Sequence, residues 1–156
     1  MERRRGLTLI EIVVVVALMV VLFGVYFLAA NPSGQLKSAR NAERKLQLQT
    51  IMNAIRQNIA DQPNGQFACA AGPLPTSSKI MASGGAPGTY DIAPCIVPTY
   101  IFALPADPSA ASSSYNAPSD YNTNYTIFIN ASSVITLSAP YTETSTVASS
   151  AISIMR

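Results

Sequence analysis

The sequence predicts an α+β protein in which one long N-terminal helix packs on a small antiparallel sheet. Three observations lead to this prediction. An uncharged apolar run occupies residues 12–30, a helical pattern of apolar residues continues over residues 35–61, and alternating apolar residues mark strands within residues 125–137. Helical segments that precede a group of strands, without alternating with them, are typical of the α+β class.

Composition excludes several classes of function. Ten basic and eight acidic residues give a net charge of +2, which argues against a basic nucleic-acid-binding protein. The 156-residue chain has no histidine, so histidine-based triads, zinc–histidine sites and haem–histidine ligation are excluded. The sequence also shows no Ser–Lys motif and no phosphate-binding glycine loop. We therefore expect no enzyme activity, no catalytic residues, no cofactor and no metal.

The apolar run over residues 12–30 is long enough to cross a membrane. As a helix it measures about 28 Å, close to the roughly 30 Å hydrocarbon core of a bilayer. The run is rich in valine, but in lipid the backbone must satisfy its own hydrogen bonds, so a helix is still expected. A buried core helix is the alternative, although so uniform an apolar surface is rare in a small soluble domain.

Charges on both sides of the run leave its orientation open. Arg3–Arg5 precede the run and place the N-terminus in the cytoplasm. A second basic group favours the reverse orientation and consists of Lys37, Arg40, Arg44 and Lys45. The polar C-terminal region, which contains both cysteines, favours export. A cleaved secretory signal is a rival interpretation, but Leu28 is too large for its cleavage site.

Glu11 lies inside the apolar segment, between Ile10 and Ile12. A charge near the middle of a membrane helix costs about 2.5–3.5 kcal/mol, and less near the end of the helix. Taken alone, the residue has two interpretations. In the first, its carboxylate reaches the membrane interface or is protonated. In the second, the carboxylate pairs with a cationic partner.

The residues around Glu11 resemble the leader and cleavage motif of type IV prepilins and type II secretion pseudopilins. A short basic leader, Arg3–Arg5, is followed by Gly6, the apolar Leu7, Thr8-Leu9-Ile10, and then Glu11 at the start of a long apolar helix. The family usually has Phe where this chain has Leu7. The resemblance implies a pilin-like fold, with the first half of the long helix transmembrane and the second half amphipathic.

The resemblance also implies how the N-terminus is processed. A prepilin peptidase would cut between Gly6 and Leu7, and the new amino group of Leu7 would be N-methylated. The Glu11 carboxylate of one subunit would then pair with the Leu7 ammonium of another. Two unit charges about 4 Å apart attract by roughly 4 kcal/mol at an effective dielectric constant near 20, which is comparable to the insertion penalty. Loss of residues 1–6 would also leave seven basic and seven acidic residues.

By the same resemblance, the chain is a structural subunit of a type IV pilus or pilus-like filament that serves adhesion, motility or DNA uptake. It would sit in cytoplasmic membrane lipid as a single-pass protein with its N-terminus inside. The pilus assembly machinery would then build it into a helical homo-oligomer at the cell surface, without direct nucleic acid binding. Two alternatives remain: a pseudopilin of a type II secretion system, and a monomeric bitopic membrane-anchored binding domain.

The chain divides into four predicted segments: a leader at 1–6, a transmembrane and filament-core helix at 7–30, a kink with an amphipathic helix at 31–61, and an extracytoplasmic β-rich domain at 62–156. Pro32 removes a backbone donor, so we expect a kink or a short unwound stretch over residues 31–34.

The second half of the helix carries an apolar stripe that we expect to pack on the globular domain. The stripe consists of Leu48, Ile51, Met52, Ile55 and Ile59, at spacings of three and four. A free amphipathic helix lying on the membrane is the alternative. The basic residues lie mostly off the stripe, so we expect them to form a solvated face or to meet acidic groups of neighbouring subunits.

In the C-terminal region, residues 62–94 look like loop. Residues 125–129 and 134–137 predict a hairpin with one face on the helix, and Ile152 and Ile154 predict a further edge strand. Residues 100–108 resemble the "LPxDP" loop of many pilins and of the major pseudopilin, where we expect Asp107 to order a turn. The acids Asp107, Asp120 and Glu143 are too scattered to predict a calcium site.

Cys69 and Cys95 are the two cysteines of the chain. Outside the cytoplasm an even pair is usually bridged, so we expect a disulfide; two free buried thiols are the alternative. Closing a loop of this size is worth roughly 3–4 kcal/mol in the chain-entropy account of disulfide stabilisation.

Overall fold

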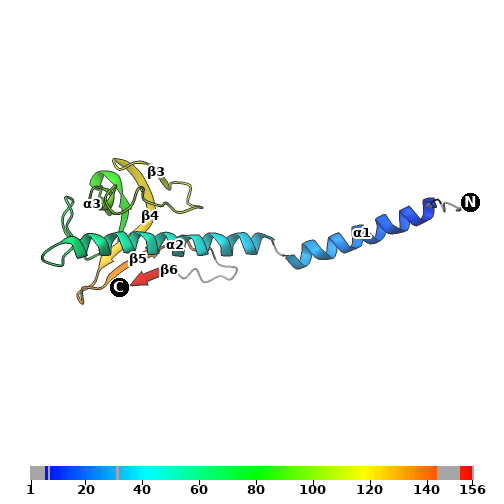
Figure 1. Cartoon of the computed structure of the whole chain (residues 1–156), viewed down its shortest axis with the longest axis horizontal. Coiled ribbons are helices and arrows are strands. Elements are labelled where there is room, and N and C mark those ends of the chain that lie inside the picture. Colours follow the sequence, from blue (N-terminus) through cyan, green and yellow to red (C-terminus); the bar gives the residue numbers. More distant parts are fainter. Residues whose placement is uncertain (1–5, 7, 31, 144–151, 156) are drawn as a thin grey trace, which may run out of the picture. The chain divides into compact units, whose positions relative to one another are not determined.

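The computed structural model of the chain describes residues 6, 8–30, 32–143 and 152–155. Arg3–Arg5, Leu7 and Asn31 lie outside the described residues. Contacts within the chain divide it into two compact units, one ending at Leu36 and the other beginning at Lys37. The order of the elements along the chain can be followed in Figure 1.

Helix α1 spans Leu9–Ala30. It begins directly after Thr8, whose carbonyl oxygen accepts hydrogen bonds from the backbone N–H groups of Glu11 and Ile12 at 3.1 and 3.3 Å. The Thr8 hydroxyl lies 3.4 Å from the same Glu11 nitrogen, as expected for a threonine preceding the first helical residue. The helical stretch that starts here is long and apolar enough to cross a membrane, by its length and composition.

Helix α2 spans Pro32–Asp61. A kink or a short unwound stretch was expected over residues 31–34. Pro32, Ser33 and Gly34 are helical, so the unwound stretch is wrong for these three. The kink stays a prediction, because Asn31 lies outside the described residues. The physical reason is the place of the proline. At the first position of a helix the missing N–H would have no partner within the helix, so proline is tolerated there.

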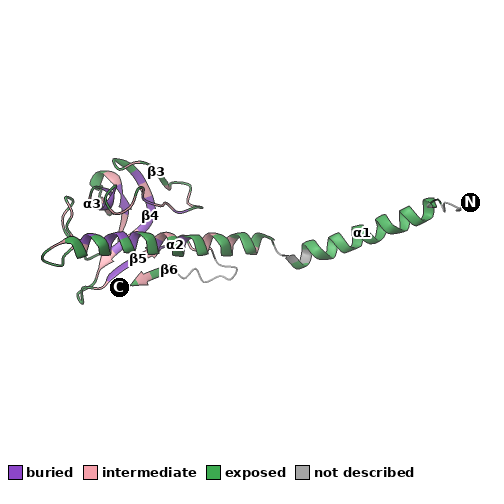
Figure 2. Cartoon of the chain, viewed as in Figure 1, coloured by how far each residue is buried: buried purple, intermediate pink, exposed green. Residues whose placement is uncertain are grey.

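The apolar stripe of α2 packs against the sheet, as the sequence predicts. Leu48, Ile51 and Ile55 are fully buried, and Ile59 is partly buried. Figure 2 shows the buried positions of α2 where it runs along the strands. The predicted α+β fold, a long helix with a sheet, is therefore confirmed.

Six strands form one sheet in the described part of the chain: β1 (Lys79–Ala82), β2 (Thr89–Tyr90), β3 (Ser114–Ala117), β4 (Asp120–Ile129), β5 (Ile135–Ala139) and β6 (Ile152–Met155). The order is β2-β1-β4-β5-β6, and β3 also pairs with β4. Because β1 and β2 run parallel, the sheet is mixed, whereas an antiparallel sheet was expected.

The predicted hairpin is confirmed as β4 and β5. Ile127 lies opposite Leu137, and Ile129 lies opposite Ile135. The side-chain oxygen of Asn130 orders the turn between them, since it accepts bonds from the N–H groups of Ser132 and Val134 at 2.9 Å each. The predicted edge strand at Ile152 and Ile154 is also confirmed and is β6, antiparallel to β5.

The expectation that residues 62–94 are loop is wrong in part. Strands β1 and β2 lie within this range, as do the single 3₁₀ turn η1 (Ser83–Gly85) and the start of helix α3 (Ala93–Ile96). These strands have four and two residues, which is too short for a readable alternation of apolar side chains. The strand conformation of β1 depends on pairing with β4, which is distant in sequence, and that of β2 depends on pairing with β1.

Candidate functional site

The residues predicted to be cleaved and methylated lie at the start of α1. Gly6 is exposed and belongs to no helix or strand, whereas Leu7 lies outside the described residues. Because α1 begins at Leu9, Glu11 falls in its first turn. There the carboxylate is near the positive end of the helix dipole, and it lies at the end of the apolar run, where a charge costs less than at the middle of a bilayer.

The surface of α1 beyond Glu11 is apolar and exposed. The described large apolar side chains of α1 after Glu11 range from 45% exposed at Val15 to 69% exposed at Leu22. Contiguous apolar surface on this scale marks a membrane or protein interaction site. The helix can therefore lie in lipid or pack among other apolar helices.

A second cluster of charged residues lies within the globular unit, around Arg44. This side chain is fully buried and makes a bidentate pair with Asp107, with Nε–Oδ2 and Nη2–Oδ1 distances of 2.8 and 3.0 Å. Nη2 also donates to Ser109 Oγ at 2.5 Å. Nη1 donates to Asn41 Oδ1 at 2.7 Å and lies 3.5 Å from Glu143 Oε2. The predicted solvated basic face is therefore wrong for Arg44, because its charge is neutralised by a residue 63 positions along the chain.

Arg40 extends this cluster to the segment after β5. Its Nε and Nη2 donate to the two carboxylate oxygens of Glu143 at 2.5 and 2.7 Å. Asn41 holds the backbone of Glu143: its amide donates to the carbonyl oxygen, and its Oδ1 accepts from the N–H at 3.1 Å. Arg40 therefore also has an acidic partner within the chain, although its side chain is about one-third exposed.

Asp107 orders a turn, as expected, besides pairing with Arg44. Its Oδ1 accepts hydrogen bonds from the N–H groups of Ser109 and Ala110 at 2.9 and 3.1 Å. Burial by itself raises the pKa of Asp107, but the bonds from Arg44 and from these N–H groups outweigh it and hold the pKa below its usual range. The hydrogen bonds from Arg40 likewise lower the pKa of Glu143.

Two of the three candidate acids for a calcium site come together at Arg44, which pairs with both Asp107 and Glu143. Asp107 and Glu143 are paired with arginines, and Asp120 lies at the start of β4. Within the described ranges, no group of three or more His, Cys, Asp or Glu residues could hold a metal ion.

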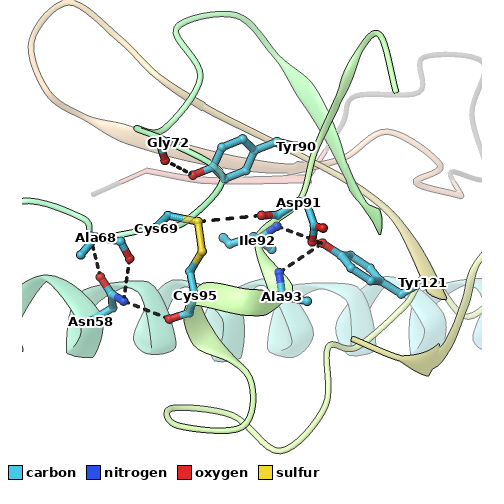
Figure 3. The surroundings of a disulfide bond; sticks show 10 residues. All are labelled: Asn58, Ala68, Cys69, Gly72, Tyr90, Asp91, Ile92, Ala93, Cys95 and Tyr121. Carbon is cyan, nitrogen blue, oxygen red and sulfur yellow. Dashed lines mark hydrogen bonds between the residues drawn. A yellow bond between two sulfur atoms is a disulfide. The ribbon is translucent and has the colours of Figure 1, made fainter. Parts of the chain in front are cut away.

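Cys69 and Cys95 form a disulfide in the structure, with their Cα atoms 4.9 Å apart (Figure 3). Cys69 lies in the loop after α2, and Cys95 lies in α3. The chain before α3 is held by the Tyr121 hydroxyl, which accepts from the N–H groups of Ile92 and Ala93 at 2.9 and 3.2 Å. The same hydroxyl donates to Asp91 Oδ1 at 2.7 Å. Burial is the main cause that raises the pKa of Tyr121.

The structural roles of two polar residues in these clusters are not predicted from the sequence. Asn58 is buried beside the disulfide, and Asn41 bonds to both Arg44 and Glu143. Asn58 did carry a signal, because it stands three positions after Ile55 on the buried stripe of α2. A polar residue at core spacing indicates a specific buried hydrogen-bond partner. Asn41 carries no comparable signal.

Comparison with known proteins adds one finding at the N-terminus. Residues 1–27 match the prokaryotic N-terminal methylation motif, the class III signal peptide of type IV pilins. The match includes Gly6, Leu7 and Glu11 and most of α1. No curated protein and no solved structure matches the chain. The motif indicates a pilin-like or pseudopilin precursor and a structural subunit, and together with the apolar α1 it fits anchoring in a membrane.

Proposed function

We propose that this chain is the precursor of a type IV pilin or pilin-like filament subunit. A prepilin peptidase cuts it between Gly6 and Leu7, the amino group of Leu7 is methylated, and copies polymerise through residues 7–60. One observation carries this proposal. The methylation motif includes most of a helix that has apolar surface on all sides and an acidic residue in its first turn.

Before assembly, α1 is held in the cytoplasmic membrane. The apolar surface lies in lipid, and Glu11 lies at the end of the span, where its charge is tolerated. On assembly, lipid around α1 is replaced by the helices of neighbouring copies, and the Glu11 carboxylate pairs with the Leu7 ammonium of a neighbour. A buried ion pair of this kind sets the register of the subunits more than it adds net stability.

The globular unit is proposed to lie outside the cytoplasm. The disulfide between Cys69 and Cys95 supports this location, since disulfides persist in oxidising compartments. The few charges of residues 62–156 also fit a subunit that packs beside many copies of itself.

The substitution Glu11→Val tests the proposal. We expect the variant to insert in the membrane and to be cleaved, because its span becomes more apolar while Gly6 and Leu7 are unchanged. Filament assembly is expected to fail, because the Leu7 ammonium has no counter-ion. Glu11→Asp is the matched control and retains the charge, so it should still assemble. Mass spectrometry of the N-terminus and electron microscopy of sheared filaments give the two readouts.

Normal filaments from Glu11→Val would overturn the pairing role. The same measurements separate the remaining functions. A processed subunit that never occurs in surface filaments indicates a pseudopilin of a type II secretion system, whose precursors begin with the same motif. An unprocessed chain that retains residues 1–6 and remains monomeric indicates a membrane-anchored binding domain.

A further inference from the structure

We infer that Asn58 positions the two cysteines for oxidation, by holding the backbone at Cys69 and at Cys95 before the disulfide forms. Three hydrogen bonds carry this inference (Figure 3). Asn58 Oδ1 accepts from the N–H of Ala68 at 3.0 Å, and Nδ2 donates to the carbonyl oxygens of Ala68 and Cys95 at 3.1 and 3.0 Å. One side-chain amide thus binds the residue before Cys69 and Cys95 itself.

The three bonds give both donors and the acceptor oxygen of the Asn58 amide a partner. A side-chain amide has two N–H donors and one carbonyl acceptor, and each of them has a backbone partner here. Asn58 is only 4% exposed, so water does not readily replace these partners. The buried amide of Asn58 requires hydrogen-bond partners whether or not the sulfur atoms are joined. The contacts of Asn58 therefore stabilise this arrangement in the reduced chain as well.

Asn58 stands on a rigid element. It lies on the buried face of α2, one turn after Ile55, which is fully buried in the core. The partner segments are distant in sequence, ten residues away at Ala68 and 37 residues away at Cys95. Tyr121 separately fixes the chain before α3 through the N–H groups of Ile92 and Ala93. Both cysteines are thus held by contacts that do not involve sulfur.

The chemistry shows at which step such positioning acts. The thiolate of one cysteine attacks the disulfide of an oxidant, such as a protein or glutathione disulfide, and one thiol leaves. The thiolate of the second cysteine then attacks the mixed disulfide, the Cys69–Cys95 bond forms, and a second thiol leaves. Two protons and two electrons pass from the chain to the oxidant. The second step is intramolecular, so its equilibrium depends on how close the two cysteines are held.

The substitution Asn58→Asp tests the inference in the full-length chain in detergent, with glutathione as the redox probe. The aspartate has nearly the same size and keeps an acceptor for Ala68, but it loses both donors. We expect the equilibrium constant for forming the Cys69–Cys95 bond from glutathione disulfide to fall by about tenfold or more under native conditions. In concentrated urea, where the contacts of Asn58 are absent, variant and parent should agree.

Thr123→Val provides a control for a merely structural effect. Thr123 is fully buried in β4, where its hydroxyl donates to the carbonyl oxygen of Met81 at 2.9 Å and accepts from the N–H of Tyr125 at 3.1 Å, so these bonds join β1 to β4 and do not hold either cysteine. Its loss should lower the stability of the fold and leave the native glutathione equilibrium unchanged. Asn58→Ser, which introduces no charge, is measured in parallel, and circular dichroism identifies which reduced variants are folded.

The inference is overturned if a folded Asn58 variant forms the disulfide with an equilibrium constant within twofold of the parent. It is equally overturned if Thr123→Val lowers that constant as much as the Asn58 variants do. If reduced Asn58→Asp does not fold, the comparison rests on Asn58→Ser, and the same two outcomes decide it.

Discussion

Asp107 compensates the charge of a fully buried arginine. Arg44 has no exposed surface, and both oxygens of Asp107 accept hydrogen bonds from its guanidinium group. Removing one partner of a buried pair leaves an uncompensated charge, which costs about 3–5 kcal/mol. We therefore expect Asp107→Asn to lower the free energy of unfolding by about that amount, measured by urea denaturation of the full-length chain in detergent.

Glu143→Gln is the matched control for this prediction. Glu143 pairs with Arg40, and both side chains of that pair are partly exposed to water. Glu143 Oε2 also lies 3.5 Å from Nη1 of Arg44, but Arg44 keeps both of its hydrogen bonds to Asp107 when Glu143 is replaced. Solvent screens the Arg40–Glu143 pair, so its loss should cost much less than the loss of the Asp107 carboxylate. Equal losses of unfolding free energy from the two substitutions would show that the burial of Arg44 does not increase the contribution of its pair with Asp107.

The Asp107 carboxylate also makes the stability of the fold depend on pH. The pKa of Asp107 is lower in the folded chain than the value of about 3.9 for an unfolded aspartate. The unfolded state therefore binds the proton first as the pH falls. The contribution of Asp107 is complete well above pH 4 and is lost progressively as the pH falls through its folded pKa. When the free energy of unfolding is measured from pH 7 downward, it should fall less steeply with pH in Asp107→Asn than in the parent chain. The same steepness in both chains would contradict this prediction.

At the scale of the element, α2 has one buried and one exposed face, and the same substitution can be made on each. Leu48 is fully buried against the sheet, whereas Leu46 on the same helix is 64% exposed. Leu48→Ala removes buried methyl groups and leaves a cavity, so we expect a loss of about 2–5 kcal/mol in the free energy of unfolding. Leu46→Ala should change it by no more than about 0.5 kcal/mol. Similar losses at the two positions would contradict the packing of α2 on the sheet.

The elements that the sequence predicts are those with a local signal. The stripe of α2 repeats over several turns, and β4 and β5 alternate around a turn with Asn130 at its start, so neighbouring residues suffice to identify them. Strands β1 and β2 have no such signal. Their conformation depends on pairing with β4 and with each other, and this also explains why the parallel pair in the sheet was missed.

The candidate sites show the same distinction. Gly6 and Glu11 belong to a contiguous motif, so the sequence identifies them directly, whereas the pairing of Glu11 with Leu7 of another copy stays a prediction. The sequence favours a solvated face or a contact with a neighbouring subunit for Arg44, because its partner Asp107 is distant in sequence. A charged side chain at the edge of an apolar stripe can be buried when the fold supplies a counter-ion. No local pattern shows that counter-ion.

At the scale of the whole molecule, the core belongs to one of the two units. Every buried residue in the described part of the chain lies between Arg44 and Ala139, within the unit that begins at Lys37. The other unit contributes apolar surface and no buried residue among those described. The core and the apolar helix that fits a membrane anchor thus belong to separate parts of the chain.

This division predicts that a chain starting at Lys37 folds without α1. It keeps the stripe of α2, the sheet, the disulfide and the arginines that pair with Asp107 and Glu143, so we expect a single cooperative unfolding transition by circular dichroism. It should also remain in water when mixed with lipid vesicles, whereas the full-length chain partitions into them. A chain starting at Lys45 is the control: it keeps Leu48 but loses Arg40, Asn41 and Arg44, so the Asp107 carboxylate is left buried without its cation. We expect this shorter chain to be markedly less stable. Absence of a cooperative transition in the chain from Lys37 would show instead that the globular unit depends on the apolar helix.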